Sequence, residues 1–158
     1  MGNNFANTDG TWSDESVAYY AERAKGQFGL ITIEATVVHK GAKGGPRKPC
    51  LYDDNSIESL KKITDACHAE GAKISIQLQN AGPEGNAKNA GAPIQAATAI
   101  AALMEETFRK QFLQSRYMSL IKGYGEAAVR RNEGRSRCSG NSHGTRLSCE
   151  FFYVTKNE

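Results

Sequence analysis

The chain of 158 residues is 39% hydrophobic and 23% charged, with a formal net charge of +3. This composition is typical of a globular protein and argues against global disorder, and the length suffices for one domain with a core. The longest apolar run, residues 96–104, is far too short to cross a bilayer, and no signal sequence follows Met1. We therefore expect a cytoplasmic protein without a membrane partner.

Neither the cysteines nor the histidines form a pattern that binds metal. His39, His68 and His143 lie far apart in the sequence, without the spacing of metal ligands. The four cysteines share no CxxC spacing: Cys50, Cys67, Cys138 and Cys149. The sequence therefore predicts neither a metal site nor a redox pair.

The first predicted helix, residues 14–25, has Ser13 as a capping residue and Gly26 as a C-terminal stop. The next run, residues 29–38 (GLITIEATVV), is almost continuously apolar, as expected of a strand buried on both faces. Residues 39–50 are rich in glycine and lysine. Because they lack the GxxxxGK[ST] pattern, they predict a loop after the strand and not a P-loop.

A second helix is predicted next, with Asn55 or Ser56 as its N-cap and Gly71 at its end. Its apolar residues recur at helical spacing: Ile57, Leu60, Ile63 and Cys67. Residues 73–79 (KISIQLQ) then alternate apolar and polar side chains, which predicts a strand. Strand, helix and strand in this order form a βαβ unit, with a parallel sheet and a right-handed crossover.

The second predicted strand has one apolar and one polar face. The apolar face carries Ile74, Ile76 and Leu78, and the polar face carries Ser75, Gln77 and Gln79. In a parallel sheet the apolar face packs against helices, so Gln77 points away from them, where a buried amide needs a partner. Two interpretations remain open: neighbouring strands satisfy Gln77, or it binds a ligand at the carboxyl ends of the strands, where barrels place their chemistry.

Five segments stand out by their order and spacing. They are Met1-Gly2 and residues 4–10 (NFANTDG), 19–31 (YYAERAKGQFGLI), 33–38 (IEATVV) and 76–82 (IQLQNAG). Together they resemble the old yellow enzyme family of FMN-dependent NADH oxidoreductases, particularly its enoate-reductase-like branch. The resemblance covers the N-terminal part of the chain, and the combination of segments is more specific than any single motif.

The resemblance implies an α/β fold: a fragment of a TIM barrel with about three strands, an irregular C-terminal tail and FMN at the C-terminal mouth. It implies that Met1 and Gly2 lie at the end of the first barrel strand. Ala35 is then expected to close the second strand against the flavin edge, and Gln77 to hydrogen-bond the flavin pyrimidine. Many family members read QLxHAG where this chain has Asn80 in place of the histidine.

The family's reaction transfers hydride from NADH or NADPH to FMN and on to an activated alkene, a small-molecule substrate. Its fourth strand carries two histidines that anchor this substrate, and they are absent from the translated residues. Glu34 has no carboxylate or histidine near it in the sequence with which to share acid-base work. We therefore expect no catalytic residues here, FMN binding that is weak or absent, and no turnover by this chain alone.

The pattern of the chain changes after Arg130, because residues 131–158 have no helical or strand period. In a shifted reading frame, residues 140–149 are compatible with the family's fourth-strand signature E-I-H-x-A-H-G-Y-L, and residues 107–119 with the helix before it. The first barrel strand is expected before Met1. We therefore expect the N-terminal part of an FMN-binding TIM barrel in residues 1–106, a helical segment partly out of frame in 107–130, and an irregular, basic, frame-shifted tail in 131–158.

Two alternatives come from other classes of protein. Five arginines gather toward the C-terminus: Arg130, Arg131, Arg135, Arg137 and Arg146. Such a cluster is found in non-enzymatic modules that bind nucleic acid, although this one lacks interleaved aromatic residues and a recognisable binding module. The other alternative is a small α/β domain without a ligand.

Overall fold

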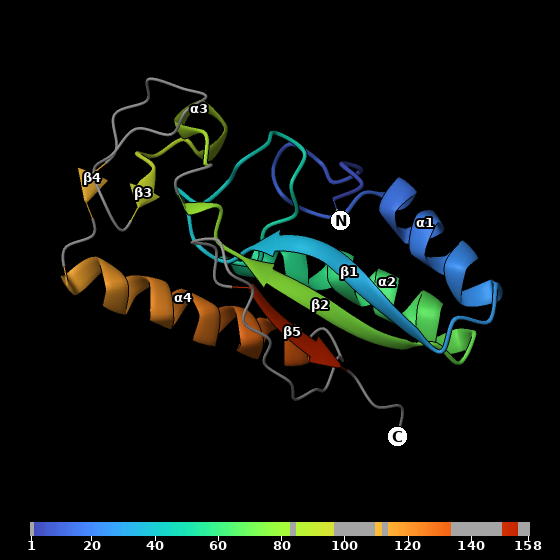
Figure 1. The fold of residues 1–158 in the computed structure, drawn as a ribbon. Helices are drawn as coiled ribbons and strands as arrows, with labels where there is room; N and C mark the ends of the chain where they lie inside the picture. The colour runs from blue at the N-terminus through green and yellow to red at the C-terminus, as the bar shows by residue number, and fades with distance from the viewer. Residues whose placement is uncertain (1, 83–84, 97–109, 112–113, 134–149, 155–158) are drawn as a thin grey trace.

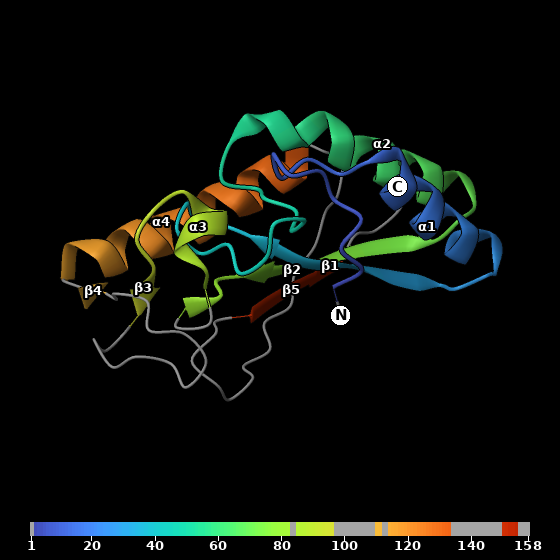
Figure 2. The same ribbon diagram turned by 90° about the horizontal axis from the view of Figure 1, so that it is seen from above.

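The computed structural model describes residues 2–82, 85–96, 110–111, 114–133 and 150–154. Its main sheet has the strand order β1-β2-β5, formed by Leu30–Val37, Lys73–Gln79 and Glu150–Val154. The helices α1 (Asp14–Lys25), α2 (Ile57–Ala69) and α4 (Gln114–Glu133) lie on one side of this sheet (Figure 1; Figure 2). The short elements are η1 (Asp54–Ser56), α3 (Ala87–Ala90) and the parallel pair β3 (Gln95–Ala96) and β4 (Lys110–Gln111).

Helix α1 begins and ends where its sequence predicts, with one difference at its end. The Ser13 hydroxyl accepts a hydrogen bond from the Ser16 amide at 3.2 Å, which caps the first turn. Gly26 follows the last helical residue but has a φ of −71°, and the left-handed conformation falls on Gln27, with a φ of 65°. The chain therefore reverses one residue later than the glycine.

Helix α2 buries the face that its spacing predicts: Leu60, Ile63, Thr64 and Cys67. The single turn η1 precedes it, and Asp53 caps that turn by accepting a hydrogen bond from the Asn55 amide at 3.1 Å. The chain leaves the helix through Gly71, whose φ of +79° suits a residue without a Cβ. Ser56, one of the two predicted caps, is the N-cap residue of α2, but its side chain makes no capping hydrogen bond.

One hydrophobic core lies between the sheet and the three helices. Ile74, Ile76 and Leu78 of β2 are at most 1% exposed and belong to the same cluster as Leu60 of α2 and Tyr20 of α1. Each such side chain contributes about 1.5–3 kcal/mol when it is fully buried. This confirms that the apolar face of β2 packs on the helices, so Gln77 lies on the opposite face.

Strands β1 and β2 pair in parallel, as the βαβ pattern predicts, but β1 contains a bulge. The ladder joins Ile33 to Ile76 and Thr36 to Leu78, which leaves Glu34 and Ala35 together opposite Gln77. A bulge bends its strand and changes the direction of its side chains, and bulges are frequent beside active sites. Two sequence-predicted site residues, Ala35 of β1 and Gln77 of β2, therefore lie across from each other at the bulge.

Helix α4 lies beside α2 on the same side of the sheet (Figure 2). It adds Tyr124 and Ala127 to the core, 8% and 0% exposed. A Cβ built at Gly123 would lie 2.9 Å from the Val38 carbonyl oxygen, so only glycine fits against the end of β1. Of the predicted helical segment 107–130, the part from Gln114 onward is helical.

Strand β5 lies within the segment predicted to be irregular. It pairs antiparallel with β2, from Glu150 opposite Gln79 to Val154 opposite Ser75. Its sequence EFFYV is rich in residues that favour strands, and the outer edge of β2 offers unpaired backbone groups. The prediction of an irregular tail is therefore wrong for these five residues, and their aromatic run is the sequence signal for the strand.

The left-handed residue after α2 gives a stability prediction. We expect Gly71→Ala to lower the free energy of unfolding by about 1 kcal/mol, because a Cβ is strained at positive φ. No other atom lies within 4 Å of the added carbon, so crowding does not contribute. Gly29→Ala is the matched control, since Gly29 has equally open surroundings without a positive φ. Urea unfolding of both variants measures the difference, and equal effects would contradict the assignment.

Candidate functional site

The candidate site lies at the carboxyl ends of β1 and β2, on the face opposite the helices. Ala35 is 8% exposed and stands at the bulge, directly across from Gln77. Gln77 is half-buried, and no hydrogen bond joins its amide group to another of the described residues. An amide in this position has both a donor and an acceptor available for a ligand.

Gly2 lies near the same end of the strands, and Met1 lies outside the described residues. A Cβ added at Gly2 would meet the Lys48 Nζ and would stand 3.3 Å from Glu34 Oε2. The Asn3 amide donates a hydrogen bond to that same carboxylate oxygen at 2.9 Å. Gly2 is therefore next to the residue that precedes Ala35, which brings three of the four sequence-predicted cofactor residues to one region.

Glu34 is the principal site residue that sequence patterns did not identify. Its side chain belongs to a residue only 2% exposed, and its Oε1 atom has no hydrogen-bond partner. Burial raises the pKa of this carboxyl, and the Asn3 amide and the Lys48 ammonium partly oppose that shift. The sequence signal that could identify Glu34 is a carboxylate inside an otherwise apolar strand. Its partners could not be found by spacing, because they are a backbone amide and a lysine in a distant loop.

Tyr20 connects α1 to this region. Its hydroxyl accepts hydrogen bonds from the Glu34 amide at 2.9 Å and from Asn3 Nδ2 at 3.4 Å. Burial raises the pKa of Tyr20 far above its ordinary value, so the hydroxyl stays protonated. The ring of Tyr20 belongs to the core, and its hydroxyl adds a polar contact to the strand.

The loops beyond the strands are joined to each other. The Ala81 amide donates to the Ala42 carbonyl at 3.2 Å, and the buried Lys43 donates its Nζ proton to the Thr8 carbonyl at 2.8 Å. Asn80, which replaces the family's histidine, is 6% exposed and accepts a hydrogen bond from the Gly82 amide at 3.2 Å. Lys43 and Asn80 therefore stabilise the loops through these hydrogen bonds.

The described residues contain no group of three His, Cys, Asp or Glu side chains that could hold a metal ion. His39 lies 3.3 Å from the Ser119 hydroxyl, between Nε2 and Oγ, whereas His68 is half-buried on α2. His143 lies outside the residues that the structure describes. Within the same part of the chain, no helix has the length and apolar character that a bilayer requires.

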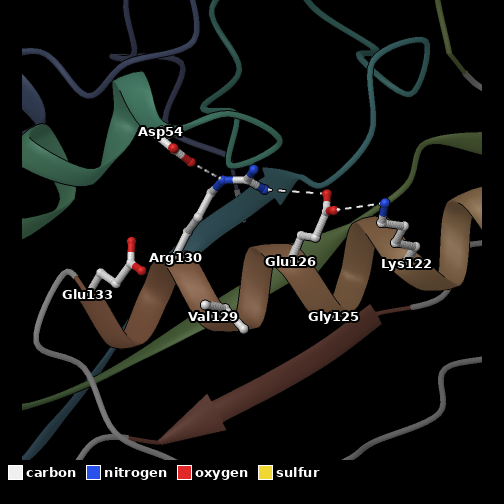
Figure 3. Close-up of a pocket in the computed structure, with 7 residues that line it drawn as sticks. All are labelled: Asp54, Lys122, Gly125, Glu126, Val129, Arg130 and Glu133. Carbon is white, nitrogen blue, oxygen red and sulfur yellow. Dashed lines mark hydrogen bonds and ion pairs between the residues drawn. The ribbon is translucent and has the colours of Figure 1, made fainter.

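A surface cavity of about 540 Å³ lies between η1 and α4, on the helical side of the sheet (Figure 3). Arg130 Nε contacts Asp54 at 2.6 Å, and Arg130 Nη1 lies 3.8 Å from Glu126. The cavity lining also includes Lys122, Gly125, Val129 and Glu133. None of the predicted cofactor residues that the structure describes lines this cavity, and two of its acidic side chains, Asp54 and Glu126, pair with Arg130 and Lys122.

The arginine cluster is only partly described. Arg130 is held by two carboxylates, and Arg131 is 4% exposed. Arg135, Arg137 and Arg146 lie outside the described residues. The two described arginines thus contribute to the helical layer, and nucleic-acid binding stays a prediction.

The parallel strands and their helices match part of a TIM barrel in solved structures. The Old Yellow Enzyme from Pichia sp. AKU4542 matches 83% of this chain with a TM-score of 0.75 and 26% identity, over 37% of its own length. A 2-naphthoyl-CoA reductase complex matches 85% of this chain with a TM-score of 0.78 and 25% identity, over 23% of its length. Morphinone reductase, at 22% identity and a TM-score of 0.75, shows the fold alone.

Sequence comparison identifies the family. The model of the NADH:flavin oxidoreductase / NADH oxidase family matches residues 2–135, and the chain belongs to this family. An NADPH dehydrogenase of Listeria monocytogenes is 40% identical over 76 residues, which are 48% of this chain and 22% of that protein. One from Listeria welshimeri is 38% identical over the same length. The chain therefore spans about a fifth of the length of the curated relatives it matches.

The buried Glu34 gives a pH prediction. Its pKa is raised in the folded state, so the fold binds the proton more tightly than the unfolded chain does. Its contribution to stability is therefore greatest at low pH and decreases as pH rises through the raised pKa. We expect the free energy of unfolding of wild type, minus that of Glu34→Gln, to fall as pH rises from the ordinary glutamate range, about pH 4, through the raised pKa. Urea unfolding across this range measures the difference, and parallel curves would contradict it.

Proposed function

We propose that this chain forms part of an FMN-dependent NAD(P)H oxidoreductase of the ene-reductase type, acting on small activated alkenes. The family match and the likeness to Old Yellow Enzyme support the flavin and the nicotinamide reductant. Bound FMN would supply hydride transfer from NADH or NADPH to the alkene. The described residues would bind and orient the flavin.

The observation that carries the proposal is the placement of Gln77 across from the bulge at Ala35. The pyrimidine edge of a flavin has one N–H donor between two carbonyl acceptors. A glutamine amide matches this edge, because it offers a carbonyl oxygen and an NH₂ group side by side. The Gln77 amide has no hydrogen bond to another described residue and is thus available.

Small residues leave room beside that amide. Ala35 has only a methyl group, and Gly2 has no side chain where the Lys48 ammonium comes closest. These two residues would admit the flat ring system, and Gln77 would fix its orientation. Met1, which the structure does not describe, belongs to the same proposed group.

The chain alone is proposed to bind FMN weakly and not to turn over. The ionisable side chains next to the bulge, Tyr20 and Glu34, are buried and hydrogen-bonded within the protein. Neither is therefore placed to give a proton to a substrate. The described residues thus hold a cofactor and provide no proton donor of their own.

A titration of the purified chain with FMN tests the proposal. We expect weak, saturable quenching of flavin fluorescence, and Gln77→Ala should weaken the affinity about fivefold, as the loss of one hydrogen bond costs about 1 kcal/mol. Lys73→Ala is the matched control, because Lys73 is an exposed residue at the other end of β2 and should leave the affinity unchanged. NADH and NADPH oxidation, followed by absorbance, should not exceed that of free FMN.

Two results would count against the proposal. One is a folded chain, shown by circular dichroism, with no saturable FMN binding at high protein concentration. The other is an equal loss of affinity in Gln77→Ala and Lys73→Ala, because this would show that the contact is not specific to the carboxyl ends of the strands. Robust NAD(P)H oxidation by the purified chain would overturn the statement that it does not turn over.

A further inference from the structure

The segment Gly2–Asn4 is held beside the bulge of β1 although it forms no strand. The Asn3 amide donates to Glu34 Oε2 at 2.9 Å, and the Asn3 side-chain amide donates to the Tyr20 hydroxyl at 3.4 Å. Asn3 also accepts a hydrogen bond from the Phe5 amide at 2.9 Å through its Oδ1 atom. Two elements of the fold, α1 and β1, therefore fix the position of this segment.

The Glu34 backbone amide is satisfied outside the ladder of β1 and β2. It donates to the Tyr20 hydroxyl at 2.9 Å, and the same hydroxyl accepts from Asn3. Tyr20 thus satisfies a backbone amide at the edge of β1 and joins it to the N-terminal segment.

Burial of the Glu34 carboxylate opposes folding unless it is well bonded. A carboxylate taken out of water needs charged or hydrogen-bonding partners, and hydrogen bonds to an ionised group are about twice as strong as neutral ones. The Asn3 amide provides such a partner for Oε2, and the charge of the Lys48 ammonium favours the ionised form without a direct ion pair. Oε1 has none, so the carboxylate is more costly to the fold than an apolar side chain would be.

We infer that Glu34 is a positioning residue of the proposed flavin site, which with Tyr20 holds Gly2–Asn4 against the bulge of β1. This inference rests on the proposed function. Its consequence is that Gly2, Ala35 and Gln77 form one surface only while the carboxylate holds the Asn3 amide. Glu34 itself need not touch the flavin, because it acts through the backbone of the segment it binds.

Hydrogen exchange of the full chain, followed by NMR, tests the contact without any cofactor. Glu34→Ala should accelerate exchange of the Asn3 amide about tenfold, as expected when a hydrogen bond to a charged group is lost. Glu34→Gln keeps a carbonyl acceptor of the same shape and should retain part of the protection. The Ile76 amide in β2 reports on the whole fold and should not change. Glu22→Gln is the control for an exposed glutamate, and it should leave Asn3 protected.

FMN titration of the same variants tests the positioning role. Glu34→Ala should weaken FMN about fivefold, with Glu34→Gln between it and wild type. If FMN binds wild type and Gln77→Ala weakens it while Glu34→Ala does not, the inference is overturned and the proposed function stands. If the folded wild type does not bind FMN, the proposed function fails and the positioning role fails with it, whatever the exchange rates show.

A second variant covers the case in which Glu34→Ala does not fold. Tyr20→Phe keeps the ring in the core and removes only the hydroxyl that the Glu34 and Asn3 groups contact. We expect faster exchange of the Glu34 and Asn3 amides and weaker FMN binding than in wild type. Unchanged exchange and affinity in Tyr20→Phe would overturn the inference.

Discussion

The bulge in β1 is the constraint on which the carboxyl end of the sheet depends. It leaves Glu34 and Ala35 of β1 together opposite the single residue Gln77 of β2. The Glu34 amide bonds the Tyr20 hydroxyl of α1, and the Glu34 carboxylate accepts from the Asn3 amide. The bulge is therefore the place where α1, the N-terminal segment and the polar face of the sheet meet.

The two faces of the sheet carry different kinds of side chain and have different roles. The face toward the helices is apolar and contains Ile74, Ile76 and Leu78, which give the fold its stability. The other face carries the polar Gln77, together with Ser75, whose hydroxyl bonds that of Thr32 at 2.6 Å. The free energy of unfolding therefore depends little on the Gln77 amide, which is the group proposed to bind the flavin. Solved structures that are about a quarter identical to this chain over the matched part still share its fold. The packing of strands and helices requires apolar side chains of suitable size and does not require particular residues.

The sequence predicts those features that depend on local patterns. Helical spacing locates α2 through Leu60 and Ile63, and alternation locates β2. The resemblance to the old yellow enzyme family predicts, from sequence motifs alone, that Ala35 and Gln77 belong to one site. The bulge could not be predicted, because strand register depends on a partner some forty residues away. The sequence draws attention to Glu34 but does not reveal its partner, since the amide it binds precedes it by 31 residues. Strand β5 depends on an edge of β2 being open, which no local pattern reports.

The strand order gives the molecule one further property. Among the described residues, β1 pairs with β2 along one edge, whereas no strand pairs along the other, where Val37 forms an isolated bridge with Cys50 and bonds Pro49 and Leu51. Phe28 and Leu30, 61% and 47% exposed, lie at the start of that open edge. Backbone groups without partners beside exposed apolar side chains form a template onto which another extended segment can add.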